Sequence, residues 1–205
     1  GMDENIRLIR GETPENADVL VSKTSMPLRE LIVPFMKLSN NGHGEMLVKE
    51  LGKVVYDEGS WDKGLQVMEE QLERFGLNVR NLQVRDGSGM SHKNLISAND
   101  MTQLLYEVQH KDWYPDFENA QPVGGEPDKM IGGTLRYRLT DESVRGKVQA
   151  KTGTLTGVST LSGYMTTQSG KRLVFSMMMN NYIGGWMPSI QDSILMAIAE
   201  HPFFE

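Results

Sequence analysis

The stretch KVQAKTGTLTGVSTLSGY, residues 147–164, joins a Lys-Thr-Gly triplet to alternating small and apolar residues. Alternation with a period of two is typical of a β-strand. A second strand-like run, KRLVFSMMMNNY at 171–182, follows after QSGK, whose serine and glycine suit a hairpin turn. Because this second run is apolar on both faces, we predict that it lies at the centre of an antiparallel sheet.

Helical patterns precede this sheet at residues 27–38, 45–55, 60–76 and 97–108. The first is predicted as a helix despite Pro34, and the last begins at a capping box of Ser97 and Asp100. The middle two predict a pair of packed helices, because apolar residues recur at helical spacing in both. Their apolar stripes are Leu47, Leu51, Val54 and Val55 in one helix and Leu65, Met68, Leu72 and Phe75 in the other.

The remaining segments complete the outline of the fold. Pro188 is typical of a helix start, and isoleucines follow it every four positions. Residues 113–133 are predicted as loop, and residues 1–26 as a linker or strand remnants. Helices followed by antiparallel strands and a closing helix predict an α/β chain of the α+β kind.

The composition limits the class of protein. The chain has 205 residues, of which 39% are hydrophobic and 23% charged, as expected of a globular domain. Its net charge of -6 argues against a nucleic-acid surface, which needs a basic stripe. No apolar run approaches membrane length, and the first residues show no basic region before an apolar run, so we expect no secretory signal within the chain. Cysteine is absent, which excludes disulfides and thiolate nucleophiles.

No metal and no cofactor are predicted. The DGSG segment at 86–89 reads as a turn, because it lacks the repeated acidic ligands of a calcium loop. The histidines show no metal-ligand spacing. They are His43, His92, His110 and His201.

The segment Lys151, Thr152, Gly153 and Thr154 has two readings. In the simpler one it is a loop-to-strand junction with a solvated lysine and a glycine that relieves crowding. In the other, a strand edge beside a cleft presents the lysine charge to a carboxylate, the threonines offer hydroxyls, and the glycine lets a substrate approach the backbone. The triplet alone does not decide between them.

Ser39 and Asn41 form a Ser-x-Asn pattern in the turn-rich segment LSNNGHGEM. Alone, this is ordinary turn chemistry. Together with the downstream Lys-Thr-Gly, it supplies two of the three elements of the penicillin-interacting serine enzymes. The third element, Ser-x-x-Lys, does not precede Ser39; the one match, Ser60 to Lys63, lies where a helix N-cap is expected.

On these motifs the chain resembles the class C low-molecular-mass penicillin-binding proteins, which are D-alanyl-D-alanine carboxypeptidases and endopeptidases of peptidoglycan. The likeness runs in the family's order through PLRELIVPFMKLSNN, GSWDKGLQVMEEQLERFG, VRDGSGMS, ISANDMTQLL and VRGKVQAKTGTLTGVSTLSGYMTTQSGKRLVFSMMMNNY. The resemblance implies a penicillin-binding, β-lactamase-like transpeptidase fold with a helical subdomain. It also implies that residues 27–205 form the C-terminal part of the catalytic domain, without its N-terminal part.

The resemblance further implies a role for each matching residue. Ser39 would relay a proton towards the leaving amine, and Asn41 would orient the acyl side chain. Lys151 and Thr154 would bind the terminal carboxylate, and Thr154 would also give one oxyanion-hole N–H. Thr152 and Gly153 complete the third motif as substrate-binding residues. The nucleophile would lie outside this chain, so we expect the chain alone to be inactive.

The implied ligands are peptidoglycan stem peptides ending in D-Ala-D-Ala and β-lactams, and the implied location of the full-length protein is the cell envelope or another extracytoplasmic site. A non-catalytic module that binds peptidoglycan peptides or a partner chain stays open as an alternative. A class A β-lactamase is disfavoured, because no Glu-x-x-Leu-Asn segment is present. Because the family's sheet draws strands from both chain ends, exposed strand edges also predict a homodimer.

Overall fold

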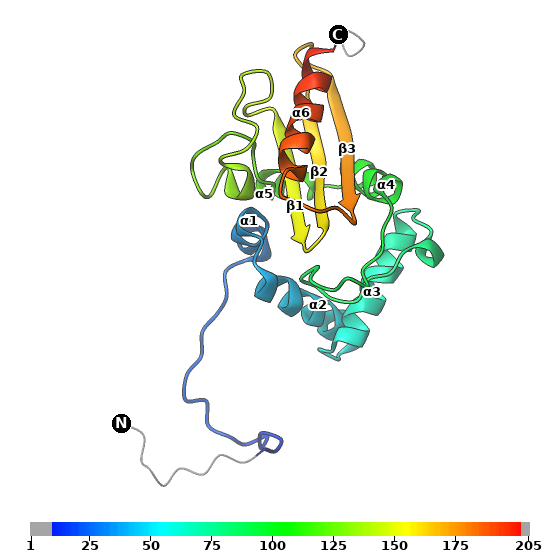
Figure 1. Cartoon of the computed structure of the whole chain (residues 1–205). Coiled ribbons are helices and arrows are strands. Elements are labelled where there is room, and N and C mark those ends of the chain that lie inside the picture. The colour runs from blue at the N-terminus through cyan, green and yellow to red at the C-terminus, as the bar shows by residue number, and fades with distance from the viewer. Residues whose placement is uncertain (1–9, 202–205) are drawn as a thin grey trace.

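The structure is a computed structural model and describes residues 10–201. Its sheet is antiparallel and has the strand order β1-β2-β3 (Figure 1). The strands are β1 Val148–Leu155, β2 Val158–Thr166 and β3 Arg172–Asn180. The predicted hairpin is confirmed, with Ser162 of β2 paired to Lys151 on one side and to Ser176 on the other.

The central strand is β2, so the prediction that residues 171–182 lie at the centre of the sheet is wrong. β3 is half-buried over most of its length. Its side chains Leu173, Phe175 and Met177 pack against the main core on one face, and helix α4 packs against the strand as well. The apolar character of β3 on both faces therefore comes from helices on both sides of the sheet.

The predicted helices are all present, although their bounds shift by a few residues. They are α1 Leu28–Leu38, α2 Asn41–Tyr56, α3 Trp61–Arg74, α4 Ala98–Val108 and α6 Met187–Glu200. Pro34 lies inside α1. The capping interaction at α4 is confirmed, because Ser97 Oγ accepts a 3.0 Å hydrogen bond from the Asp100 N–H.

The predicted loop at 113–133 is wrong in part, because helix α5 spans Tyr114–Ala120. Seven residues are too few to show a helical period in the sequence. A proline in the first turn favours the helix, and the Tyr114 ring packs edge-on against Tyr164 with centroids 5.7 Å apart. Two short 3₁₀ helices complete the fold, η1 Val79–Asn81 and η2 Gly133–Leu135.

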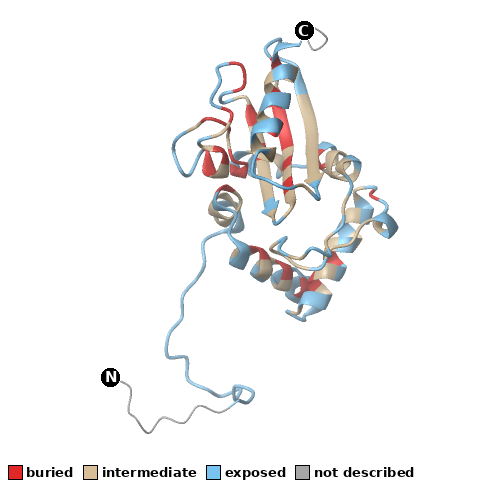
Figure 2. Cartoon of the chain, in the orientation of Figure 1, coloured by how far each residue is buried: buried red, intermediate tan, exposed pale blue. Residues whose placement is uncertain are grey.

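The helices surround the sheet (Figure 1). Helix α6 lies across one face, α1 lies beside β1, and α2, α3 and α4 form an arc around the lower part of the molecule. Buried residues gather in the strands and in the segments packed on them (Figure 2). The core consists of Leu135, Leu139, Val144, Val148, Ala150, Leu161, Met165, Leu195 and Ala199.

The packing of α2 on α3 uses glycines rather than the predicted stripe. Leu51, Val54 and Val55 are exposed, Val54 to 74%. A Cβ on Gly64 of α3 would lie 1.9 Å from the carbonyl oxygen of Val48, so the two backbones are in direct contact. Hydrophobic spacing alone does not reveal such a contact, and the predicted face of α2 is therefore wrong.

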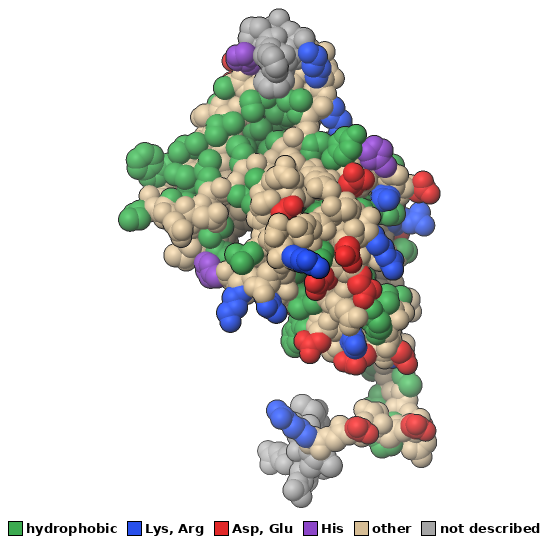
Figure 3. Space-filling model, turned by 90° about the vertical axis from the view of Figure 1, so that its right-hand side faces the viewer, with side chains coloured by type: hydrophobic (Ala, Val, Ile, Leu, Met, Phe, Trp, Pro, Cys, Tyr) green, Lys and Arg blue, Asp and Glu red, His purple; other side chains and the backbone are tan. Residues whose placement is uncertain are grey.

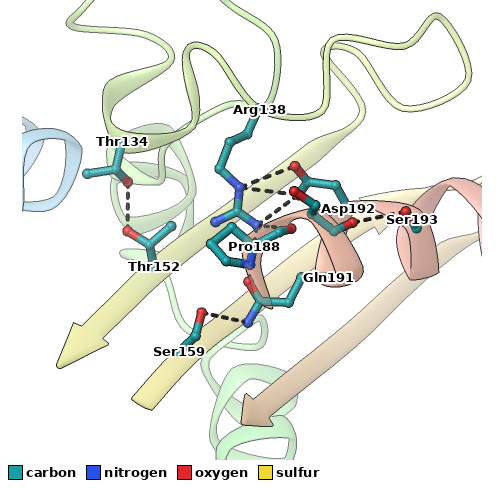
Figure 4. A network of polar contacts seen from close by, with 9 residues as sticks. Thr134, Arg138, Thr152, Ser159, Pro188, Gln191, Asp192 and Ser193 are labelled. Atoms are coloured by element: carbon teal, nitrogen blue, oxygen red, sulfur yellow. Dashed lines mark hydrogen bonds and ion pairs between the residues drawn. The ribbon is translucent and has the colours of Figure 1, made fainter. Parts of the chain in front are cut away.

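An arginine fixes the start of α6 above the sheet (Figure 4). Arg138 Nη2 donates to Asp192 Oδ1 at 2.8 Å, to the Pro188 carbonyl at 3.0 Å and to Gln191 Oε1 at 3.1 Å. Gln191 is fully buried and donates to Ser159 Oγ of β2 at 3.3 Å. The isoleucines at 190 and 194 are each 39% exposed, so they do not face the core.

Residues 10–26 form no helix or strand and are exposed throughout. They lead away from the rest of the molecule (Figure 1). The boundary at residue 27 remains a prediction, and residues 1–9 lie outside the described part of the chain. Within the described part, no helix is both long enough and apolar enough to span a membrane.

Candidate functional site

Ser39 ends helix α1 in a left-handed backbone conformation, with φ 53° and ψ 55°. Its N–H still bonds the Phe35 carbonyl, so the residue closes the helix as its C-cap. A residue with a Cβ is uncommon in this region of backbone space, and such strained positions cluster at functional sites. The serine of the Ser-x-Asn pattern is therefore held in a fixed, strained turn.

Lys151 lies in β1 and contacts this serine directly. Its Nζ donates to Ser39 Oγ at 2.7 Å and to the Thr152 carbonyl at 2.8 Å. Burial lowers the pKa of Lys151 to about 8, because the ammonium is partly removed from water. The two sequence motifs thus meet at one point, and the lysine there can give up a proton at mildly alkaline pH.

The outer edge of β1 is covered only up to Ala150. The Ala150 N–H donates to the Pro122 carbonyl at 3.0 Å, and the Gly124 N–H donates to the Val148 carbonyl at 2.9 Å. In an antiparallel strand, alternate residues direct their N–H and C=O to the same edge, so Thr152 and Thr154 also point outward. No other strand in the described part of the chain pairs with this edge. An extended peptide could bind there.

The residues after Lys151 differ in their surroundings. Thr152 Oγ1 donates to Thr134 Oγ1 at 2.9 Å, so this hydroxyl is used inside the fold (Figure 4). A Cβ on Gly153 would lie 2.5 Å from Thr160 Oγ1, so packing against β2 already favours glycine. Thr154 is exposed and leaves its hydroxyl accessible.

The two asparagines after Ser39 have different positions. Asn40 is the N-cap of α2, because its Oδ1 accepts a 3.0 Å hydrogen bond from the His43 N–H. Asn41 is the first residue of that helix and is exposed. The structure therefore uses Asn40 for capping and leaves Asn41 open to a ligand.

Ser60 is the N-cap of α3, as predicted. Its Oγ accepts from the Lys63 N–H at 3.3 Å and donates to Glu58 Oε1 at 2.7 Å. The Lys63 ammonium instead bonds Gln66 Oε1 at 3.3 Å. This serine and lysine therefore do not form a nucleophile and base pair.

Lys37, two residues before Ser39, is a site residue that the sequence did not reveal. It is only 3% exposed, and its Nζ donates to the main-chain carbonyl of Gln121. Burial lowers its pKa to about 8. A lysine in the last turn of a helix is usually a surface cation, so the only sequence signal for Lys37 is its closeness to the Ser-x-Asn pattern.

The turn predicted at 86–89 is confirmed. The Asp86 carboxylate accepts from the Ser91 N–H at 2.7 Å, from Asn94 Nδ2 at 2.8 Å and from the Gly89 N–H at 2.9 Å. These donors hold both carboxylate oxygens within the turn. Among residues 10–201, no cluster of three or more histidine or acidic side chains could hold a metal ion.

Known proteins resemble this chain over most of its length. The D-Ala-D-Ala carboxypeptidase 3 (S13) family matches residues 1–200. A D-alanyl-D-alanine carboxypeptidase of Actinomadura sp. (strain R39) is 42% identical over 187 residues, which are 91% of this chain and 35% of that protein. The D-alanyl-D-alanine carboxypeptidase DacB of Haemophilus influenzae is 27% identical over 192 residues, which are 92% of this chain and 39% of that protein.

A solved structure extends the likeness to the fold. The crystal structure of penicillin-binding protein 4 (dacB) from Haemophilus influenzae, complexed with a novel β-lactam, matches with a TM-score of 0.82 and 25% identity. The match covers 93% of this chain and 45% of that one. The chain therefore spans less than half the length of each of these proteins.

Proposed function

The chain belongs to the D-Ala-D-Ala carboxypeptidase 3 (S13) family, and from this premise we propose that it forms one wall of a serine D-Ala-D-Ala peptidase site. The wall comprises Ser39, Asn41 and the segment from Lys151 to Thr154. The sequence-based prediction of the C-terminal part of a low-molecular-mass penicillin-binding protein, with its fold, is confirmed by the family and structural matches. The activity, substrates and partners of the whole protein are part of the proposal.

One observation carries this proposal: Lys151 Nζ donates to Ser39 Oγ at 2.7 Å across 112 residues of sequence. A lysine and a hydroxyl in contact can pass a proton, and a buried ammonium can also attract a carboxylate. The exposed Thr154 and the outward N–H groups of β1 lie beside them. The set suits a peptide that ends in a carboxylate.

In the proposed reaction a serine hydroxyl oxygen attacks the carbonyl of the D-Ala-D-Ala bond, and its proton passes to a neighbouring lysine. The tetrahedral intermediate then expels the terminal D-alanine, whose amine takes a proton relayed through Ser39. Lys151 and Thr154 hold the terminal carboxylate, and Asn41 orients the acyl side chain. Water hydrolyses the resulting ester. The attacking serine belongs to a Ser-x-x-Lys motif that does not precede Ser39 in this chain.

The same wall would bind β-lactams, which resemble the D-Ala-D-Ala end in carrying a carboxylate next to a reactive amide. The substrates proposed here are peptidoglycan stem peptides, which places the full-length protein in the cell envelope or another extracytoplasmic location. For the chain alone, a homodimer is proposed.

The first test is intact-mass spectrometry after treatment with a labelled penicillin. We expect no covalent adduct, because the Ser39 hydroxyl is assigned as a proton relay beside Lys151 and Ser60 is a helix cap. An adduct on either serine would contradict the assignment of these residues. The measurement uses the chain as it stands.

The second test is titration of the chain with a D-Ala-D-Ala peptide. Lys151→Ala should weaken binding about tenfold or more, since a hydrogen bond to a charged group contributes about 1.5–3 kcal/mol. Lys147→Ala is the matched control, because Lys147 Nζ bonds the Ser143 carbonyl and not Ser39. Equal affinity in wild type and Lys151→Ala would refute the proposed carboxylate site.

A non-catalytic peptide-binding module is the second candidate. The outer edge of β1 beyond Ala150 favours it, because no strand in the described part of the chain pairs there and an extended peptide can bind without a covalent step. Both candidates predict peptide binding by this chain. They differ once the chain is combined with the N-terminal part of a family member that carries Ser-x-x-Lys: recovery of penicillin labelling supports the peptidase, and persistent binding without labelling supports the module.

A further inference from the structure

Lys37 is a buried lysine without an acidic partner among the described residues, which is rare in proteins. It is 3% exposed, and in the described part of the chain no ion pair includes it. Its ammonium donates to the Gln121 main-chain carbonyl, 84 positions away in the sequence. Lysines are almost never fully buried without a partner charge, and an apolar side chain of similar volume would avoid the cost of desolvation. Stability alone therefore does not explain why a lysine occupies this position.

The ammonium of Lys37 is connected to β1 on the N-terminal side of Lys151. It bonds Gln121, and the next residue, Pro122, accepts the Ala150 N–H at 3.0 Å. Val123 then forms an isolated bridge with Gln149. The ammonium thus holds α1 to a segment that is itself hydrogen-bonded to β1 just before Lys151.

The backbone of Lys37 is connected to β1 on the other side of Lys151. A Cβ on Gly133 would lie 2.4 Å from the Lys37 carbonyl oxygen, so η2 packs directly on the end of α1. Thr134, the next residue, accepts the hydrogen bond from Thr152 Oγ1 at 2.9 Å (Figure 4). The ammonium and the carbonyl oxygen of Lys37 therefore contact two different segments, and these segments are hydrogen-bonded to β1 on either side of Lys151.

We propose that Lys37 is a positioning residue, which clamps the C-terminal end of α1 to Gln121 and so holds Ser39 against Lys151. Ser39 follows two residues later in a strained backbone conformation, and it would relax without such a restraint. The inference deepens the proposed function, since it rests on Ser39 and Lys151 forming the working pair.

The test measures the pKa of Lys151 in the whole chain by NMR of ¹³Cε-labelled lysine, with the Lys151 signal assigned from Lys151→Arg. Lys37→Met keeps an unbranched side chain as far as Cε and removes the ammonium. We expect the Lys151 pKa to rise from about 8 towards the ordinary lysine value of 10.5, because water reaches the ammonium when Ser39 moves away. A residue that only stabilises the fold would lower the melting temperature without this shift.

Two further variants make the test specific. Lys37→Gln keeps a donor for the Gln121 carbonyl and should give a smaller rise. Lys147→Met removes another lysine that bonds a main-chain carbonyl, that of Ser143 at 3.1 Å, and should leave the Lys151 pKa unchanged.

An unchanged Lys151 pKa in folded Lys37→Met would overturn the inference, as would an equal rise in Lys147→Met. If neither Lys37 variant folds, Lys37 is required for folding and the positioning role is rejected. The measurement uses no peptide. A pKa shift together with absent peptide binding would therefore uphold the role of Lys37 and reject the proposed function.

Discussion

Lys151 Nζ lies 2.7 Å from Ser39 Oγ, and burial lowers the pKa of this lysine to about 8. The contact joins the end of helix α1 to strand β1. It places a hydroxyl beside an ammonium that loses its charge within an accessible pH range. The protonation state of this one residue should therefore control the binding of anionic ligands.

We predict that a peptide carboxylate binds more weakly as the pH rises through about 8. Below this value Lys151 is charged and attracts the carboxylate, and above it the neutral amine does not. If only the charged form binds, the affinity at pH 9 should be about tenfold below that at pH 7, since apparent affinity follows the competent fraction. Isothermal titration at several pH values measures this.

The control for this prediction is Lys151→Arg, whose guanidinium stays charged throughout this range. Its affinity should not fall between pH 7 and pH 9. A wild-type affinity that is independent of pH over the same range would be incompatible with a carboxylate held by Lys151.

The backbone at Ser39 gives a second prediction. Ser39→Gly and Ser39→Ala both remove the hydroxyl, but only glycine adopts φ 53° without strain. The glycine variant should therefore be more stable than the alanine variant by about 1 kcal/mol. Within a helix the order is the opposite, because alanine has the higher helix propensity. Urea unfolding compares the two, and an alanine variant of equal or greater stability would show that the turn is not strained.

The ion pair of Arg138 and Asp192 gives a third prediction. Both side chains are 19% exposed, and the arginine also bonds two groups of α6. Arg138→Met should cost about 2 kcal/mol of unfolding free energy, less than for a fully buried pair, because it leaves a partly buried carboxylate without its partner. Adding Asp192→Leu should recover much of the loss. A double variant as unstable as the sum of the two single variants would show that the pair is not coupled.

The contact between α2 and α3 gives a fourth prediction. Gly64→Ala places a methyl group 1.9 Å from the Val48 carbonyl oxygen and should destabilise the chain by about 1–3 kcal/mol. Gly59→Ala is the control, because its Cβ would meet nothing closer than 3.8 Å. Since alanine favours a helix over glycine, a neutral or stabilised Gly64→Ala would disprove the close backbone contact.

Local sequence patterns predicted the features of the fold that depend on residues close together in the sequence. The hairpin of β2 and β3, the caps at Ser60 and Ser97 and the existence of five helices follow from turn residues and periodicity. Helix α5 was missed because it is too short to show a period. The motifs carrying Ser39 and Lys151 are recognisable because each is contiguous. The family resemblance implies that both belong to one site, but their direct contact appears only in the structure.

Long-range packing could not be predicted in the same way. The run of residues 171–182 looks central, since helices cover both of its faces, yet β3 ends the sheet among the described residues. The exposed stripe of α2 and the inward glycine at 64 depend on how closely α3 approaches. Lys37 is equally hidden, because its partner Gln121 lies 84 positions away and acts through its main chain.

The last prediction is that the chain associates into a dimer. In the described part of the chain, no strand pairs with the outer edge of β3, and an unpaired edge can recruit another strand. Hydrophobic side chains gather on the upper part of the molecule on this side (Figure 3). Ile190 and Ile194 of α6 are each 39% exposed, and Trp186 is 69% exposed. A symmetric copy would cover such a surface.

Light scattering at micromolar concentration should therefore give twice the 23.0 kDa of one chain. Ile194→Glu should shift the mass towards the monomer if the α6 face takes part, because a carboxylate is costly to bury in an apolar contact. Removal of residues 1–26 should leave the dimer intact, since residues 10–26 are exposed and lead away from the sheet (Figure 1). A mass of 23.0 kDa at every concentration would rule out self-association and leave the β3 edge open in the isolated chain.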